Sequence, residues 1–197
     1  MIYLLVLIII LVFCIYFLKK DVENLTNKWS TLASKNYKVR EELPNSDDTP
    51  NIIAKLELFI DEFISYLDGN NPHDKRVKRL KDRLYDIRLE ESKFEPGTSS
   101  YTINKGELIS MCVRHKNEDK DFHDYQTLLF VVIHELAHVA SISKGHNKEF
   151  LDNFKFLLKH AVESGKYHPV DYSKNPITYC GVKVTNNPYY NESFQLV

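Results

Sequence analysis

Apolar residues recur every three or four positions along two segments in the first half of the chain. Such a stripe faces one side of an α-helix, because the helix has 3.6 residues per turn. Residues 51–67 and 73–92 are therefore each predicted to form an amphipathic helix, separated by the turn residues of 68–72. The two stripes are Ile53, Leu56, Ile60, Phe63 and Leu67, and then Val77, Leu80, Leu84 and Ile87.

The second half of the chain mixes short β-prone runs with two longer helical patterns. The runs 99–103 and 107–113 flank Asn104-Lys105-Gly106, which predicts a β-hairpin with a three-residue loop. Helices are predicted over 126–145 and 146–167, each with a glycine near its C-terminus, and one short strand is predicted within 177–184. These elements are predicted to belong to one domain over residues 51–197, whose start is bracketed by Pro44 and Pro50.

The N-terminal segment has a different character, because residues 2–18 contain no charged side chain. This length is near the lower limit for a membrane-spanning helix. No basic residue precedes the segment and no pair of small residues follows it, so an uncleaved transmembrane anchor over 1–20 is favoured over a signal peptide. Lys19 and Lys20 predict that the following side faces the cytosol. Residues 21–50, which are mostly polar, are predicted to form a stalk.

Charge and cysteine content narrow the classes of partner. The chain has 26 basic and 27 acidic residues, so no overall positive field favours nucleic acid. A basic helix over 75–88 offers a local surface for phosphate, but acidic residues interrupt it and few aromatic side chains accompany it. Cys14, Cys112 and Cys180 lie far apart in the sequence, which predicts no disulfide framework and no four-cysteine zinc site. A reducing compartment fits this cysteine usage.

The stretch HELAH, at residues 134–138, contains the most specific chemistry in the sequence. His134 and His138 are four residues apart, so on a helix they share one face and can bind the same zinc ion. Glu135, beside the first histidine, is then the candidate general base that accepts a proton from a water molecule. The surrounding run LLFVVIHELAHVA is strongly apolar, and these polar side chains would be costly to bury there without partners.

A catalytic zinc site commonly has three protein ligands and one open position, so a third ligand is expected outside the motif. His146 is the leading candidate, because it follows Gly145 at the predicted junction between two helices. His160, Glu149 and Glu163 on the following helix remain alternatives.

HELAH followed by GH-x-x-x-F, at Gly145-His146 and Phe150, resembles the zincin metallopeptidases of the WLM and SprT-like group. Similar histidine arrangements occur in a group of small predicted metal-dependent hydrolases. The resemblance covers about residues 95–165. It implies a zincin-like α+β fold with a small sheet and an HExxH active-site helix. It also implies Zn²⁺ as cofactor, His134, His138 and His146 as ligands, Glu135 as general base, and 107–113 as the strand that binds substrate.

The function predicted first is a membrane-anchored zinc metallopeptidase acting on a protein or peptide, with its catalytic domain on the cytosolic side. A second hypothesis is a non-catalytic, membrane-anchored scaffold stabilised by zinc, which a fourth ligand from Cys180 or His168 would favour. A third is a hydrolase of non-peptide bonds with the same metal site. Tyr172, Tyr179 and His168 are the candidates for stabilising an oxyanion.

Overall fold

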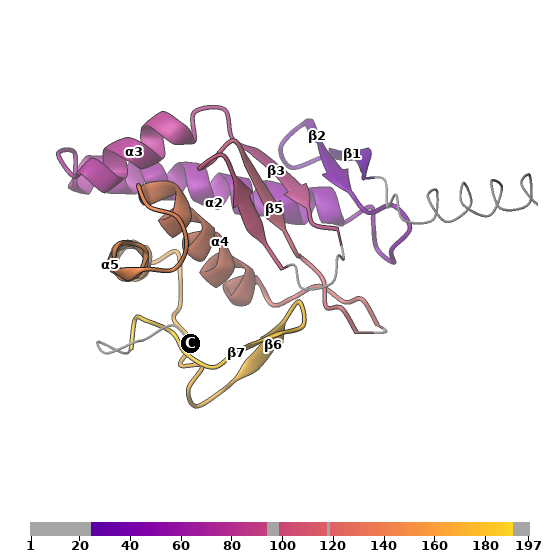
Figure 1. Cartoon of the computed structure of the whole chain (residues 1–197). Helices are drawn as coiled ribbons and strands as arrows, with labels where there is room; N and C mark the ends of the chain where they lie inside the picture. The colour runs from indigo at the N-terminus through magenta and orange to yellow at the C-terminus, as the bar shows by residue number, and fades with distance from the viewer. Residues whose placement is uncertain (1–24, 94–98, 118, 191–197) are drawn as a thin grey trace, which may run out of the picture.

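The computed structural model describes residues 25–93, 99–117 and 119–190, and these residues form a mixed α+β fold (Figure 1). The predicted α+β class is therefore confirmed. The strands are β1 (Thr26–Ser30), β2 (Lys35–Val39), β3 (Arg88–Glu91), β4 (Tyr101–Ile103), β5 (Leu108–Met111), β6 (Ile177–Tyr179) and β7 (Val182–Val184). The helices are α2 (Thr49–Asn70), α3 (Lys75–Arg83), α4 (Tyr125–Ala140) and α5 (Lys148–Glu163).

The main sheet has five strands in the order β1-β2-β3-β5-β4. Strand β3 pairs in parallel with both β2 and β5, whereas β1–β2 and β4–β5 are antiparallel hairpin pairs. Strands β6 and β7 form a separate two-stranded sheet. In the main sheet β4 lies at an edge and β5 lies between two neighbours.

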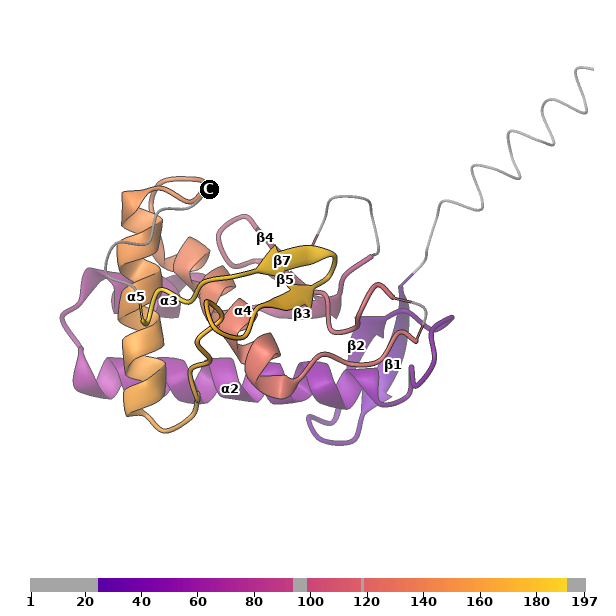
Figure 2. The ribbon, with the colours of Figure 1, turned by 90° about the horizontal axis from the view of Figure 1, so that it is seen from below.

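Helix α2 packs against β1, β2 and β3 of the main sheet and continues beyond them against α3 and α4 (Figure 2). Pro50 lies in its first turn, where a missing backbone N–H costs nothing. The apolar stripe predicted from the sequence is the face that α2 buries: Ile53, Leu56, Ile60, Phe63 and Leu67 are all fully buried. This first predicted helix is confirmed, with its start two residues earlier than expected.

The second predicted helix is shorter than the pattern indicated. Helix α3 ends at Arg83, and residues 88–91 of the predicted helix form strand β3 instead. In β3, Leu89 and Glu91 are buried while Arg88 is exposed, which is the alternation of a strand. The sequence concealed this change because Ile87 continues the helical stripe of 77–84, and because Glu91 is a charged residue at an interior position.

Arginines of α3 bind the C-terminal end of α4. The Arg79 Nε donates a hydrogen bond to the Ala140 carbonyl oxygen at 2.6 Å. Arg83 donates to the carbonyl oxygens of Val139 and Ser141, the latter at 2.9 Å. Helix ends leave carbonyl groups without intrahelical partners, and cations there are stabilising. Helix α4 ends at Ala140, where these arginines bind its carbonyl groups. The predicted end at Gly145 was five residues too late.

Because Arg79 and Arg83 point into the protein, the basic helix is mainly a structural element. Lys81 forms an ion pair with Asp68 at 2.6 Å, and Arg76 forms one with Asp74 at 2.5 Å. The nucleic-acid contact considered for residues 75–88 is therefore not supported.

The N-terminal predictions need correction. The transmembrane anchor predicted at 1–20 falls outside the described residues. Within the described ranges, no helix combines the length and the apolar character needed to cross a bilayer. The single-pass membrane location with a cytosolic catalytic domain is therefore withdrawn. The stalk predicted over 21–50 is also wrong in its described part, since β1 and β2 form a hairpin of the main sheet there.

Cys112 and Cys180 are 68 residues apart in sequence and form a disulfide, with their Cα atoms 6.4 Å apart. The prediction of no disulfide was wrong, because residues far apart in sequence become neighbours once the β6–β7 turn folds back to the residue after β5. Cys112 follows β5, and Cys180 lies in the turn between β6 and β7. The disulfide therefore connects the small sheet to the main sheet.

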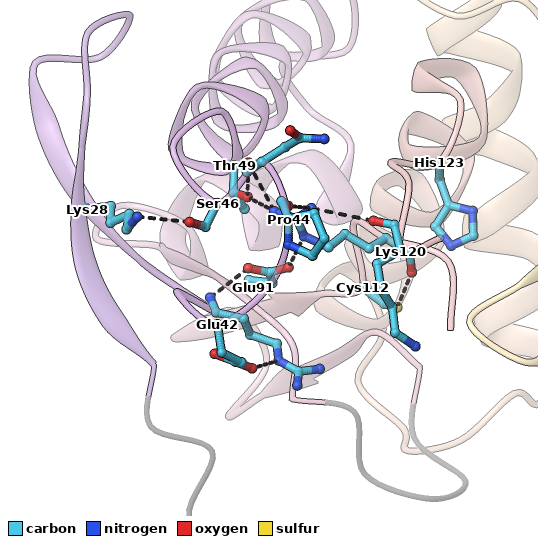
Figure 3. A network of polar contacts seen from close by, with 12 residues as sticks. Lys28, Glu42, Pro44, Ser46, Thr49, Glu91, Cys112, Lys120 and His123 are labelled. Atoms are coloured by element: carbon cyan, nitrogen blue, oxygen red, sulfur yellow. Dashed lines mark hydrogen bonds and ion pairs between the residues drawn. The ribbon is translucent and has the colours of Figure 1, made fainter. Parts of the chain in front are cut away.

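A buried ion pair joins the N-terminal hairpin to the rest of the fold (Figure 3). Arg114 and Glu91 are 0% and 1% exposed, and the Arg114 Nε lies 2.9 Å from the Glu91 Oε1. The second Glu91 oxygen accepts a hydrogen bond from the backbone N–H of Arg40 at 2.7 Å. The Arg114 guanidinium also donates to the Pro44 carbonyl oxygen and to the Thr49 hydroxyl. The guanidinium thus connects β3 to the start of α2, and the Glu91 carboxylate connects both to the residue that follows β2.

Removal of the charge on Glu91 is expected to destabilise the protein strongly, because the Arg114 guanidinium would stay buried without its counter-ion. We expect Glu91→Gln to lower the free energy of unfolding by about 3 kcal/mol. The control is Glu107→Gln, since the Glu107–Arg88 ion pair is 52% and 62% exposed and should be worth less than about 1 kcal/mol. Urea unfolding measures both, and equal losses would contradict the structural role of the buried pair.

Candidate active site

Three histidine side chains converge on one point beside α4. His134 and His138 lie one turn apart on α4, and His146 comes from the loop between α4 and α5. The His146 Nε2 lies 3.1 Å from the Nε2 of His138 and 3.1 Å from the Nε2 of His134. Asn147 is the N-cap of α5, and its side chain accepts a hydrogen bond from the Phe150 N–H. His146 is thus fixed at the entrance of α5.

The three nitrogens suit a single zinc ion. Nitrogens bound at 2.0–2.1 Å to a tetrahedral ion would lie about 3.3 Å from each other, close to the 3.1 Å that separates the His146 Nε2 from each of the other two. Burial lowers the pKa of His134 well below its ordinary value, lowers that of His138 to about 4, and also lowers that of His146. The rings are therefore neutral near pH 7, each with a lone pair for a metal. Three neutral imidazole nitrogens that meet at one point cannot all form hydrogen bonds with one another. A metal cation can accept the lone pairs of all three.

Glu135 faces the same space from the neighbouring position on α4. Its side chain is 3% exposed, and the Thr102 hydroxyl donates a hydrogen bond to its Oε2 at 2.7 Å. Burial raises the pKa of Glu135 to about 7, and the bond from Thr102 opposes that rise. A carboxylate with this pKa can exchange a proton near neutral pH. No sequence motif indicated Thr102, because the fold alone brings it to Glu135.

The histidines and Glu135 line a cleft of about 650 Å³. Its walls are β4 and the following turn, α4, the loop before α5, and the β6–β7 hairpin. The lining residues are Ser99, Ser100, Tyr101, Thr102, Asn104, Lys105, Phe130, Val131, His134, Glu135, His138, Lys144, Gly145, His146, Tyr179, Val182 and Val184.

The strand that borders the cleft differs from the predicted one. The hairpin around Asn104-Lys105-Gly106 is confirmed, but 107–113 contains β5, which lies inside the sheet. The edge strand along the cleft is β4. Gly106 has a positive φ of 124°, and a Cβ there would lie 3.1 Å from the Arg83 carbonyl oxygen and 3.2 Å from a Val139 methyl. The hairpin turn can pack against α3 and α4 because this residue is glycine.

The alternative third ligands lie away from the histidine cluster. His160, in the last turn of α5, has its Nδ1 2.8 Å from a carboxylate oxygen of Glu163, and its ring packs on Phe156. Glu149 binds the loop that carries His146: its carboxylate accepts hydrogen bonds from the backbone N–H groups of Ile142, at 2.8 Å, and Ser143, at 2.9 Å. These bonds hold the pKa of Glu149 at about 2.

The aromatic and histidine candidates of the C-terminal tail occupy different places. Tyr179 lines the cleft, and its hydroxyl lies 2.6 Å from the Ser100 Oγ. Tyr172 is buried edge-on against Phe130 and does not line the cleft. His168 is exposed, and its backbone N–H donates to Gln126. Only Tyr179 of the three is therefore placed to act on a molecule in the cleft.

The family model for the WLM domain matches residues 93–193, slightly more than half of the 197 residues. An uncharacterized protein of Acanthamoeba polyphaga mimivirus is 29% identical over 183 residues, which cover 90% of this chain and 92% of the relative. An uncharacterized protein of Invertebrate iridescent virus 6 is 40% identical over 80 residues, 40% of this chain and 44% of the relative.

Among solved structures, this chain is similar to Wss1 from Saccharomyces cerevisiae. The identity is 21%, the TM-score is 0.47, and the alignment covers 65% of this chain and 88% of Wss1. The family match includes the edge strand, the HELAH helix and His146, all of which border the cleft. This chain belongs to the WLM domain family.

Proposed function

We propose that this protein is a zinc-dependent metallopeptidase that hydrolyses peptide bonds in a protein or peptide substrate. The observation that carries the proposal is the convergence of three histidine nitrogens beside a buried glutamate in one open cleft. Membership of the WLM domain family supports a metallopeptidase-like hydrolase.

The chemistry follows from the side chains of the cleft. The ligands would be His134, His138 and His146, and a zinc ion bound there supplies a Lewis acid for the scissile carbonyl and the attacking water. Glu135 accepts the proton from the attacking water and then donates it to the leaving amine. The hydrogen bond from Thr102 holds the Glu135 carboxylate in one orientation, so that it faces the cleft before substrate arrives.

Strand β4 offers a binding edge for the substrate backbone. Its pairing with β5 uses one side, and in the described sheet it has no strand on the other. An extended peptide that pairs with this edge gains main-chain hydrogen bonds without a sequence requirement. Thr102, in the middle of β4, contacts Glu135, so a peptide on this edge would place its backbone close to the general base.

The scaffold alternative is less well supported. Structural zinc sites normally have four protein ligands, whereas the histidine group found among the described residues has three members. Cys180 is joined to Cys112, and His168 does not line the cleft. Neither Cys180 nor His168 therefore supplies the fourth protein ligand that a structural zinc site would need.

The general-base role is tested by Glu135→Gln in the zinc-loaded full chain, with unfolded casein as substrate. The amide keeps the side-chain shape but cannot accept the proton, so kcat should fall by about 10²–10⁴ while zinc content stays the same. Glu163→Gln is the control, because Glu163 pairs with His160 outside the cleft and its loss should leave kcat unchanged. Undiminished cleavage by Glu135→Gln would remove Glu135 from this role.

The third ligand is tested by a pair of histidine variants. We expect His146→Ala to lose most of its zinc on dialysis, because two imidazoles hold the ion far more weakly than three. His160→Ala should retain as much zinc as the unchanged chain, since its ring lies against Phe156. Elemental analysis gives the ratio of metal to protein, and a full zinc content in His146→Ala would assign the third ligand elsewhere.

Glu149 is expected to strengthen zinc binding without touching the ion, because it orders the loop that carries His146. Glu149→Gln should raise the zinc dissociation constant about 10-fold, a typical effect of losing a residue that supports a ligand. Asp152→Asn removes an exposed carboxylate of the same helix and should leave affinity unaltered. Competition with a chromogenic chelator measures both constants, and identical affinities for the two variants would contradict the role of Glu149.

A further inference from the structure

The β6–β7 hairpin forms one wall of the cleft although it is not part of the main sheet. Tyr179, Val182 and Val184 line the cleft from this hairpin. Strands β6 and β7 pair with each other, and Figure 1 shows the hairpin lying apart from the five-stranded sheet. The position of this wall therefore depends on side-chain connections rather than on a backbone ladder.

The strongest of these connections is the Cys112–Cys180 disulfide. Cys112 is fully buried and Cys180 is 3% exposed. Cys180 and Gly181 form the two-residue turn of the hairpin, with φ of 49° and 82°. Such a turn commonly has asparagine or aspartate before glycine, and a cysteine with positive φ persists where other contacts fix it. The bond to Cys112 supplies that contact.

Hydrogen bonds continue from the disulfide to the edge strand. The Ser100 Oγ accepts a hydrogen bond from the Cys112 N–H at 3.0 Å and lies 2.6 Å from the Tyr179 hydroxyl. These contacts close a ring. The disulfide joins Cys180 to Cys112, two hydrogen bonds join Cys112 to Ser100 and Ser100 to Tyr179, and the peptide bond joins Tyr179 to Cys180. Ser100 directly precedes β4, whose Thr102 donates to Glu135. The ring therefore reaches the side chain proposed as general base.

His123 packs against this ring and helps to enclose it. The imidazole is 5% exposed, its Nε2 lies 3.7 Å from the Cys180 Sγ, and its ring centroid lies 4.6 Å from that of Tyr179. Nothing in the sequence around His123 indicates this burial. Two thiolates and this imidazole could in principle bind a metal. The disulfide leaves no thiolate for that role.

We propose that the Cys112–Cys180 disulfide is a redox-sensitive brace that positions Tyr179 and the β6–β7 hairpin against the start of β4. This inference rests on the proposed peptidase function and adds regulation to the same cleft. A dithiol reductant can open the brace: one of its thiolates attacks a cysteine sulfur, and its second thiol resolves the mixed disulfide. Cys112 and Cys180 each gain one electron and one proton, and the reductant leaves as a disulfide.

The first measurement needs no activity. Thiols are counted in the unfolded full chain, and we expect one before reduction and three after it, because the chain has three cysteines and the brace contains two. Hydrogen exchange of the folded chain is then compared with and without a water-soluble phosphine, which reduces the disulfide and leaves as the phosphine oxide with oxygen from water. Amides of 177–184 should exchange at least 10-fold faster after reduction, while those of α4 stay protected.

The second measurement uses casein cleavage by the zinc-loaded full chain. We expect kcat/KM to fall about 10-fold on reduction, with one zinc ion per chain before and after. The double variant Cys112→Ser/Cys180→Ser should have the reduced value and no response to the phosphine, whereas Cys14→Ser, which keeps the brace, should respond like the unchanged chain.

A double-mutant cycle separates positioning from general stability. Tyr179→Phe removes the hydroxyl bonded to Ser100 and should lower kcat/KM several-fold when the disulfide is present. In the double serine background the same change should have little further effect, because Tyr179 is no longer held in place. Additive losses would mean that the two features act independently and would overturn the brace.

Other outcomes also decide the proposal. Equal exchange and equal kcat/KM in the oxidised and reduced chain would overturn it. So would three free thiols together with a second zinc ion per chain, which would assign Cys112, His123 and Cys180 to a metal site. A chain that cleaves nothing would instead count against the proposed function, and hydrogen exchange at 177–184 would still test the brace.

Discussion

The placement of two half-buried imidazoles and a buried carboxylate in the apolar helix α4 is the constraint on which the cleft depends. From Leu128 onward, every other side chain of this helix is apolar and buried. Polar groups in such a position are costly unless each has a partner. Thr102 supplies a partner for Glu135, and His146 completes a nitrogen cluster whose remaining need is a cation.

The elements around α4 hold this polar face in place. Arg79 and Arg83 of α3 bind its last carbonyl groups, and the Lys105 ammonium donates to the His138 carbonyl oxygen at 3.2 Å. Glu149 binds the backbone of the loop that brings His146 to the cluster. Charged residues that the sequence pattern places on the protein surface thus bind the end of the HELAH helix and the loop after it.

Periodicity and local motifs predicted what depends on neighbouring residues. The stripe of α2, the hairpin at Gly106, the HELAH helix and the α+β class could all be read from the sequence. Strand β3 was missed because Leu89 and Glu91 follow a charged helix, and the edge strand was misplaced because sheet order depends on long-range pairing. The Cys112–Cys180 disulfide and the burial of Arg114 also depend on contacts between residues far apart in sequence, so the sequence pattern did not predict them. The membrane location was inferred from residues 2–18 alone, which lie outside the described chain.

The central claim is that three histidine nitrogens hold one zinc ion in a site with an open position. X-ray absorption at the zinc edge of the loaded full chain tests this most directly, because it reports the type and distance of the atoms bound to the metal. We predict three imidazole nitrogens at about 2.0–2.1 Å and one further oxygen from water. A sulfur ligand at about 2.3 Å, or a fourth protein nitrogen in place of the oxygen, would contradict the claim.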